Sequence, residues 1–287
     1  MTAWTHWPAP AKLNLFLHIT GRRADGYHEL QTVFQLLDWG DDIALAPRSD
    51  GRIERVRGLT GVAPADDLVV RAALALKPYA APECGADIAV DKRIPAGGGL
   101  GGGSSDAATV LVALNAIWHC GLSVDTLADL GLALGADVPL FVRGRSAWAE
   151  GVGEALTPID LPERWYVVVD PQTSVPTGPL FQVPELTRDA APTTIPRFLA
   201  GAEVSNVFEP VVAARYPTVA QALIWLGRYG RARLSGSGGC VFLDVADEAQ
   251  ALAIARECPE GYAAYAARGV NRSPLMTALE QFGNEKS

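Results

Sequence analysis

Residues 12–19, KLNLFLHI, show the clearest two-residue alternation in the chain. Aliphatic side chains occupy every second position: Leu13, Leu15, Leu17 and Ile19. The intervening face is more polar and carries Lys12, Asn14, Phe16 and His18. Successive side chains of a strand point to opposite faces, so the segment predicts a strand with one buried face. Lys12 and Asn14 are then expected to project together.

Patterning along the rest of the chain predicts alternating strands and helices. Residues 29–46 are expected to form a strand, a turn at DWGDD and a second strand. Further strands are expected at residues 87–90, 146–151, 165–170, 240–245 and 262–268. Helical spacing of apolar residues predicts helices at 65–79, 107–120, 124–134, 204–216, 217–229 and 248–257. Residues 190–202, rich in Pro and Thr, predict a loop.

This mixed order of strands and helices predicts an α+β fold with two domains packed across a cleft. Pro158 and Pro162 bracket the expected boundary. We therefore expect an N-terminal domain over residues 1–155 and a C-terminal domain over residues 156–287.

A glycine-rich loop precedes the helix expected at 107–120. Six of the seven residues from Gly97 to Gly103 are glycine. Glycine lets a bulky anion approach the backbone, because no Cβ stands in the way. Ser104, Ser105 and Asp106 follow where helix N-caps are expected. Unpaired N–H groups and the positive end of the helix dipole would face the loop, so the segment predicts a phosphate site.

Other phosphate loops fit less well. No Gly-Lys-Ser/Thr closes the loop, which excludes a Walker A motif. A dinucleotide site needs an acidic residue ending a second strand, and the candidate, Asp125, lies in a helical pattern. Protein-kinase signatures are absent. A flexible linker is the remaining alternative, but linkers seldom run directly into a capped apolar helix.

Net charge and cysteine spacing indicate which partners and which cellular compartment the protein is expected to have. The chain has 24 Lys and Arg against 32 Asp and Glu, a net charge of −8, and no basic cluster. This balance argues against nucleic-acid and anionic-membrane partners. The four cysteines are scattered without CxxC spacing, which favours a reducing compartment over disulfides or a zinc site. We see no secretory signal and no apolar run that spans a bilayer, so we expect a cytoplasmic protein.

Several segments together resemble the GHMP kinases. In chain order they are PAKLNLFLHITGRRADGYHEL, IPAGGGLGGGSSDAATVLVALN, LGADVPLFVRG, AEGVGEALTP and LSGSGGCVFL. The resemblance implies the two-domain GHMP kinase fold, with an N-terminal domain like the second domain of ribosomal protein S5 and a ferredoxin-like C-terminal domain. It is strongest to the branch that uses ATP to phosphorylate the 2-hydroxyl of a cytidine diphosphate-linked methylerythritol, in non-mevalonate isoprenoid biosynthesis.

The resemblance also assigns roles around the phosphate. ATP is expected along the glycine-rich loop, on Pro95, Ala96, Gly97, Gly98, Gly99, Leu100, Gly101, Gly102, Gly103, Ser104 and Ser105. It implies that Lys12 is catalytic and close to the transferred phosphoryl, although from the residues alone Lys12 is a surface lysine at a strand start. It implies that Asp137 is the catalytic base and contacts substrate, although alone this residue suggests an N-cap or turn aspartate.

A second group of residues is implied to hold the substrate. Tyr27 and His28 would recognise the cytosine, since a Tyr ring stacks and a neutral His offers one donor and one acceptor. The alternative is a half-exposed aromatic pair that opens a strand. Phe181 would stack on the base opposite Tyr27, and its alternative is a core aromatic. Asn14 and Thr177 complete the substrate set implied by the resemblance. The second glycine cluster, LSGSGG, would lie beside the phosphate site.

The expected cofactors are ATP and Mg²⁺, and the metal ligands stay open, with Ser104 or Ser105 as candidates. The expected partners are ATP and the small-molecule substrate, with the chain a monomer or a homodimer. Three other functions remain open: a GHMP kinase for a different alcohol, a decarboxylase on the same fold, and a non-catalytic nucleotide sensor. The joint presence of Lys12 and Asp137 speaks against the sensor.

Overall fold

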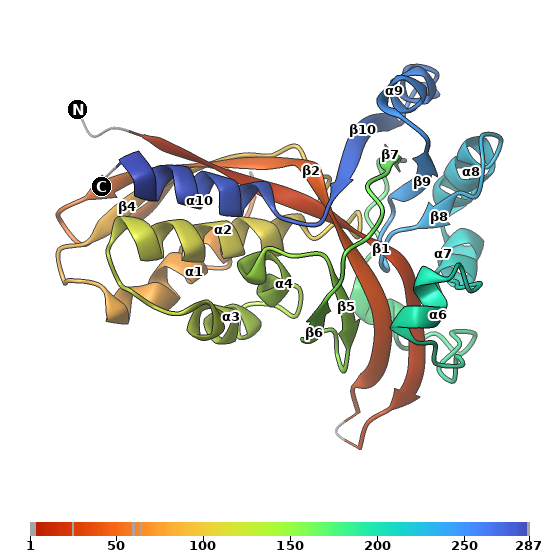
Figure 1. Cartoon of the computed structure of the whole chain (residues 1–287), viewed down its shortest axis with the longest axis horizontal. Coiled ribbons are helices and arrows are strands. Elements are labelled where there is room, and N and C mark those ends of the chain that lie inside the picture. Colours follow the sequence, from red (N-terminus) through yellow and green to blue (C-terminus); the bar gives the residue numbers. More distant parts are fainter. Residues whose placement is uncertain (1–3, 25, 59–60, 64, 286–287) are drawn as a thin grey trace.

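A long antiparallel ribbon of two strands runs through the molecule (Figure 1). These strands are β1 (Thr5–Arg22) and β2 (His28–Arg48). The computed structural model of the chain describes residues 4–24, 26–58, 61–63 and 65–285. Within this part of the chain, ten strands join in one sheet system, with β3-β4-β2-β10-β7-β9-β8 as its main path. β1 pairs with β2, and β5 pairs with both β2 and β6.

The remaining strands are β3 (Ile53–Arg57), β4 (Gly85–Asp91), β5 (Ala147–Glu150), β6 (Ala155–Pro158), β7 (Trp165–Asp170), β8 (Arg233–Leu234), β9 (Val241–Val245) and β10 (Ala263–Val270). The helices are α1 (Leu68–Leu76), the 3₁₀ helix η1 (Lys77–Tyr79), α2 (Gly102–Ile117), α3 (Val124–Leu132), α4 (Val138–Arg143), α5 (Thr177–Leu180), α6 (Ile195–Leu199), α7 (Glu209–Arg215), α8 (Pro217–Leu226), α9 (Glu248–Arg256) and α10 (Pro274–Glu285). The mixed α+β composition expected from the sequence is confirmed.

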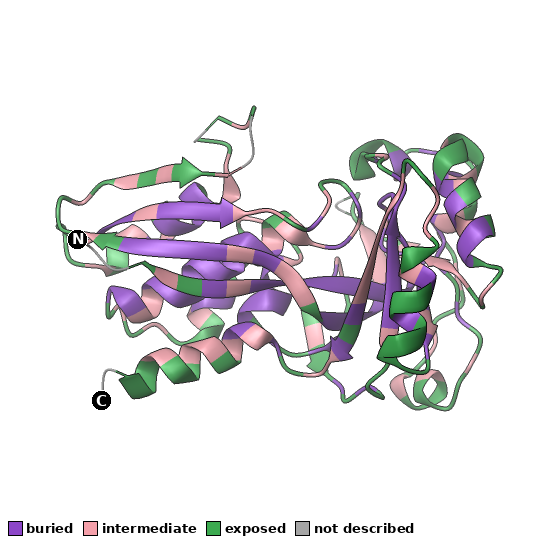
Figure 2. Cartoon of the chain, turned by 90° about the horizontal axis from the view of Figure 1, so that it is seen from above, coloured by how far each residue is buried: buried purple, intermediate pink, exposed green. Residues whose placement is uncertain are grey.

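Three hydrophobic clusters form the core, and β1 contributes to each of them. The first packs α1, α2, α4 and α10 against β1, β2 and β4. The second joins the far end of β1 to β7, β9 and the helices α7, α8 and α9. The third fills the space where the middle of β1 meets β7 and β9. Buried residues line the ribbon and the facing sides of the helices (Figure 2).

The strand expected at residues 12–19 is confirmed, and both of its faces are buried. Lys12 and Asn14 are only 4% and 2% exposed. A register shift between Asn14 and Leu17 divides the aliphatic set between two core clusters. A neighbouring layer covers the polar face, which the alternation within a single strand does not reveal.

The turn predicted at DWGDD is wrong, because β2 runs unbroken through it. The pairing of β1 with β2 is shifted between Pro10 and Lys12, so the segment forms a bulge in a continuous strand. Gly40 serves close approach here, since a Cβ on it would lie 2.1 Å from the backbone oxygen of Ala9. Gly40 is therefore needed for the close approach of two strands, whereas the sequence pattern suggested that it was needed for a turn.

Other boundaries also differ. α2 begins at Gly102 and its N-cap is Gly101, so Ser104, Ser105 and Asp106 lie inside the helix and do not cap it. The predicted loop at 190–202 contains α6, which the side chain of Thr194 caps. The sequence analysis did not predict β3 or α10. In the described part of the chain no helix is both long and apolar enough to cross a bilayer.

We predict that Gly40→Ala lowers the free energy of unfolding by about 1–3 kcal/mol, because its Cβ would overlap the backbone of β1. Urea denaturation measures the change. Gly21→Ala is the matched control in the same ribbon, since no atom lies within 4 Å of its added Cβ. Equal stability of the two variants would contradict this account of the bulge.

Candidate active site

The glycine-rich loop links β4 to the start of α2 and lines a cavity of about 330 Å³. Leu68, Lys92 and all of residues 94–104 line this cavity. Gly99 and Gly101 have φ angles of 77° and 76°, in the left-handed region that favours glycine. The loop therefore delivers the N-terminus of a 16-residue helix to the cavity, and its free N–H groups suit an anion.

A second glycine-rich segment, between β8 and β9, packs closely against the first and hydrogen-bonds to it. The backbone N–H of Cys240 donates to the oxygen of Gly98 at 3.1 Å. A Cβ on Gly99 would lie 2.0 Å from the backbone oxygen of Ser235, so no side chain fits there. Asn206 holds this second loop, and its Nδ2 donates to the oxygens of Leu234 at 2.9 Å and Gly236 at 2.7 Å. The sequence analysis named the second loop but did not assign its residues to the site.

β1 places Lys12 at the junction of these loops. Its Nζ donates to Asn14 Oδ1 at 2.5 Å and to the backbone oxygen of Gly99 at 2.9 Å. Asp137 Oδ2 lies 3.6 Å from the same nitrogen. Burial lowers the pKa of Lys12, and the charge of Asp137 opposes that shift. The ammonium is thus held in a buried position beside Asp137, whose carboxylate lines the same cavity.

Asp137 owes its position to the turn between α3 and α4. It is the N-cap residue of α4 in helical conformation, and its side chain makes no cap hydrogen bond. Its carboxylate is about one third exposed and faces a central cavity of about 280 Å³. That cavity brings together these predicted site residues: Lys12, Asn14, Gly99, Gly101, Asp137, Thr177 and Phe181. Ser237, which the sequence analysis did not single out, shares a 2.7 Å hydrogen bond with Thr177.

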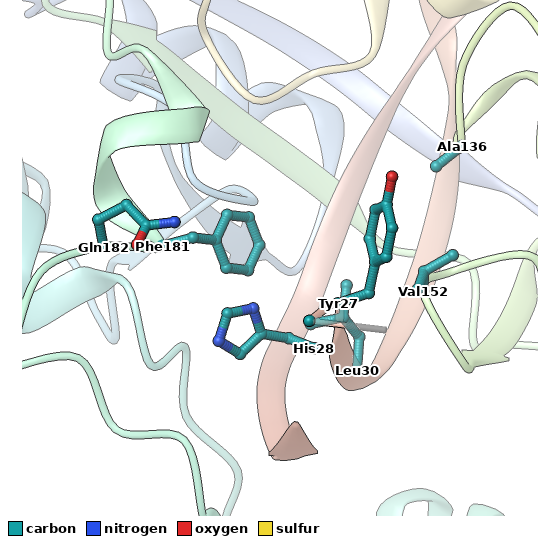
Figure 3. A pocket seen from close by; sticks show the side chains of 8 residues that line it. Tyr27, His28, Leu30, Ala136, Val152, Phe181 and Gln182 are labelled. Carbon is teal, nitrogen blue, oxygen red and sulfur yellow. The ribbon is translucent and has the colours of Figure 1, made fainter. Parts of the chain in front are cut away.

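A second hollow, of about 470 Å³, adjoins the central cavity and contains the predicted aromatic residues. The two cavities share Leu30, Ala136, Val152 and Phe181. Tyr27 lies on one side of the hollow and Phe181 on the other (Figure 3). Gln182 also lines it and was not expected from the sequence.

His28 occupies the Phe181 side of this hollow. Its ring stacks on Phe181 with centroids 5.0 Å apart and planes 25° apart. Burial lowers the pKa of His28, and the cationic Arg188 and Arg22 add to the shift. Its Nε2 is buried without a hydrogen-bond partner in the described part of the chain. These pKa shifts favour the neutral imidazole, whose ring lines the hollow beside Phe181.

A charged triad lies beneath the glycine-rich loop. Lys92 Nζ contacts both carboxylates, with Asp106 Oδ2 at 2.8 Å and Asp41 as the other partner. Asp41 also accepts hydrogen bonds from the backbone N–H groups of Arg93 and Ile94. Burial raises the pKa of Asp106 to about 7, although Lys92 opposes the shift. The sequence pattern does not reveal this triad, because Asp41 lies in the DWGDD segment that was expected to form a turn.

The two candidate metal ligands differ in position. Ser104 lines the cavity of the glycine-rich loop, whereas Ser105 is completely buried and its hydroxyl has no partner among the described residues. No group of three or more His, Cys, Asp or Glu side chains with metal-site geometry occurs in residues 4–24, 26–58, 61–63 and 65–285.

Family comparisons agree with this geometry. The GHMP kinases N terminal domain matches residues 67–145, and the GHMP kinases C terminal domain matches residues 192–264. The fold and the site thus define a phosphotransferase of this type: the chain belongs to the GHMP kinases, which are ATP-dependent enzymes.

Individual relatives narrow the class. The chain is 60% identical over 284 residues to the 4-diphosphocytidyl-2-C-methyl-D-erythritol kinase of Halorhodospira halophila, covering 98% of each chain. It is 59% identical to the same-named enzyme of Xanthomonas axonopodis pv. citri, covering 97% of this chain and 95% of that one. A crystal structure of 4-(cytidine 5'-diphospho)-2C-methyl-D-erythritol kinase superposes with a TM-score of 0.81 at 34% identity, over 93% of this chain and all of the other. Among the GHMP kinases, the chain groups with these enzymes.

The raised pKa of Asp106 predicts how the free energy of unfolding depends on pH. Between about pH 4 and pH 7 the folded protein keeps a proton on Asp106 that the unfolded chain has already lost. Stability from this group is therefore greatest at low pH and falls as pH rises towards 7. We expect Asp106→Asn to remove that fall, so that the variant gains stability relative to wild type between pH 5 and pH 8.

Urea denaturation at several pH values checks this expectation. Asp129→Asn, at an exposed position on α3, is the control and should follow the wild-type profile. Parallel profiles for wild type and Asp106→Asn would show that Asp106 does not titrate in this range.

Proposed function

We propose that this chain transfers the γ-phosphoryl group of ATP to the 2-hydroxyl of 4-diphosphocytidyl-2-C-methyl-D-erythritol, in non-mevalonate isoprenoid biosynthesis. The observation that carries the proposal is the junction of two cavities. One holds the Lys12–Asp137 pair and the other, continuous with it through Phe181, is flanked by aromatic rings. The names of relatives at about 60% identity support the same substrate.

ATP would bind with its phosphates along the glycine-rich loop. The start of α2 offers backbone N–H groups, and Lys92 lines the same cavity. Lys12 lies where the loop meets the central cavity, since it donates to Gly99, which lines both. The terminal phosphate would therefore reach the ammonium of Lys12 and face the acceptor across the central cavity.

In the transfer step, the 2-hydroxyl oxygen bonds to the γ-phosphorus while the bond from that phosphorus to the β–γ bridging oxygen breaks. Asp137 would orient the hydroxyl and accept its proton. A carboxylate is a weak base for an alcohol, but a loose transition state tolerates this because the proton leaves late. Lys12 would stabilise charge on the moving phosphoryl group, and its buried position strengthens that interaction.

The cytidine would occupy the aromatic hollow. Tyr27 and Phe181 lie on opposite sides of the hollow, and both would contact the base. His28, stacked on Phe181, would approach the edge of the base. Asn14 and Thr177 line the central cavity, where the methylerythritol would lie. We assign these five residues to substrate binding.

Mg²⁺ is the expected companion of ATP, and it would neutralise charge on the phosphates. Ser104 fits a supporting role because it lies in the lining of the phosphate cavity.

We further propose the division into residues 1–155 and 156–287, a monomer or homodimer in solution, and a cytoplasmic location. α10 departs from this division, because it belongs to the second segment but packs against β1 and α2 in the N-terminal half. Four free cysteines suit a reducing compartment.

We predict that Asp137→Asn lowers kcat by about 10²–10⁴-fold, because the amide cannot accept the proton. The dissociation constant for ATP should stay nearly unchanged, since Asp137 lies outside the cavity of the glycine-rich loop. Steady-state ADP release and ATP titration measure the two quantities. Asp160→Asn, at an exposed position between β6 and β7, serves as the control. Undiminished turnover in Asp137→Asn would remove this residue as the base.

We predict that His28→Ala raises the KM for the cytidyl substrate by roughly tenfold, which corresponds to about 1.4 kcal/mol of lost binding. The KM for ATP should change much less, because His28 does not line the phosphate cavity. His6→Ala, at an exposed histidine outside both cavities, is the matched control. Equal changes in the two KM values would argue against recognition of cytosine by His28.

A further inference from the structure

A separate cavity of about 280 Å³ lies on the other side of β1 from the active site. Asn14 lines the central cavity and the next residue, Leu15, lines this one, as expected for opposite faces of a strand. The two cavities share no lining residue. Its volume is close to the lower limit of small-molecule sites. We call it the arginine cavity.

Three arginines and one aspartate supply the charge of this cavity: Arg164, Arg231, Arg233 and Asp244. Asp244 pairs with two of them, accepting from Arg164 Nη1 at 3.1 Å and from Arg233 Nη2 at 2.6 Å. A single carboxylate cannot neutralise three guanidinium groups, so the lining carries an excess of positive charge. Glu209 lies outside the lining and accepts a hydrogen bond from the backbone N–H of Leu234.

The arginines also keep donors available. Arg231 Nη2 donates to the backbone oxygen of Val204 at 2.7 Å, and Arg231 is otherwise exposed. Arg233 Nε is buried and has no partner among the described residues. Burial lowers the pKa of Arg233, with Asp244 opposing the shift. Arg233 is already paired with Asp244, and its Nη1 donates to the backbone oxygen of Leu15 at 3.2 Å. The donors open to a ligand therefore belong to Arg164 and Arg231, which are both exposed.

Much of the remaining wall is apolar and includes Leu15, Leu161, Phe198 and Leu199, while Gln35 and Tyr166 also line it. α6 supplies two of these residues and packs beside β1, with the rings of Phe16 and Phe198 centred 5.5 Å apart (Figure 1). The cavity therefore combines a cationic side with an apolar side.

We propose that the arginine cavity is a second ligand site, which binds a small phosphorylated molecule with an apolar group. The phosphate would be held by Arg164, Arg231 and Arg233, whose planar guanidinium groups match phosphate oxygens in pairs. The apolar group would contact α6 and Leu15. Free phosphate and a phosphate ester share the charged contacts, and only the ester uses the apolar wall.

Residues that line the arginine cavity are close in sequence to residues that contact the second glycine-rich loop of the active site. Leu15 follows Asn14, Arg233 lies two residues before Ser235, and Val204 lies two residues before Asn206. Asn14, Ser235 and Asn206 all contact or hold the second glycine loop. A ligand in the arginine cavity would thus act on the loop that supports the phosphate site, which predicts coupling to nucleotide binding.

Phenyl phosphate is the probe, and calorimetric titration into protein saturated with ADP measures its affinity. We expect binding to wild type, and at least tenfold weaker binding to Arg164→Gln/Arg231→Gln. Arg256→Gln, an exposed arginine on α9, should bind as wild type does. Lys12→Ala should also keep the affinity, because Lys12 belongs to the other cavity. Phenol and inorganic phosphate, each lacking half of the probe, should bind more weakly.

Three results would overturn the site: no binding at millimolar probe, equal affinity in the double variant, or loss of affinity in Lys12→Ala. The last would place the probe in the active site. Coupling is tested by the dissociation constant for ADP, which should change at least threefold at saturating phenyl phosphate in wild type and remain constant in the double variant. A constant value in both proteins would refute the coupling.

Discussion

The close contact of two glycine-rich loops is the constraint on which the rest of the site depends. A Cβ on Gly238 would lie 2.1 Å from the backbone nitrogen of Gly99, so neither loop tolerates a side chain at this contact. One loop comes from each half of the chain. The contact brings the start of α2 beside Lys12 on β1, and Lys12 in turn donates to Gly99. The proposed phosphate site and the proposed catalytic lysine therefore depend on the same backbone packing.

Local electrostatics resolve the apparent conflict between an acidic protein and a polyanionic substrate. The net charge is −8, yet the two cavities proposed for the phosphates are lined by a helix N-terminus, Lys12 and Lys92. Asp41 and Asp106 hold Lys92 in place, whereas Lys12 donates to Asn14 and Gly99 and lies 3.6 Å from Asp137. Buried charges interact strongly, because little water screens them. Position matters more here than overall charge.

Much of this arrangement could be predicted from the sequence. The alternation around Lys12, the glycine run and the helix after it are local signals, and the structure contains all three elements. The resemblance to GHMP kinases then gathered distant residues such as Asp137 and Phe181 into one site, and the central cavity contains both. The sequence did not reveal contacts between residues that lie far apart along the chain. Asp41 was expected in a turn but is buried against Lys92. Gly40 allows β1 to pair closely with β2, because a Cβ there would overlap the backbone of Ala9. α6 was hidden in a Pro-rich segment that packs on a distant strand.

The most direct test measures ADP release with ATP, Mg²⁺ and 4-diphosphocytidyl-2-C-methyl-D-erythritol, beside galactose, mevalonate and homoserine as alternative acceptors. Our account predicts turnover with the cytidyl compound alone. Turnover with another acceptor would keep the phosphate chemistry and contradict the assignment of the aromatic hollow to cytosine. Nucleotide binding without turnover on any acceptor would contradict the account of Lys12 and Asp137 as catalytic groups.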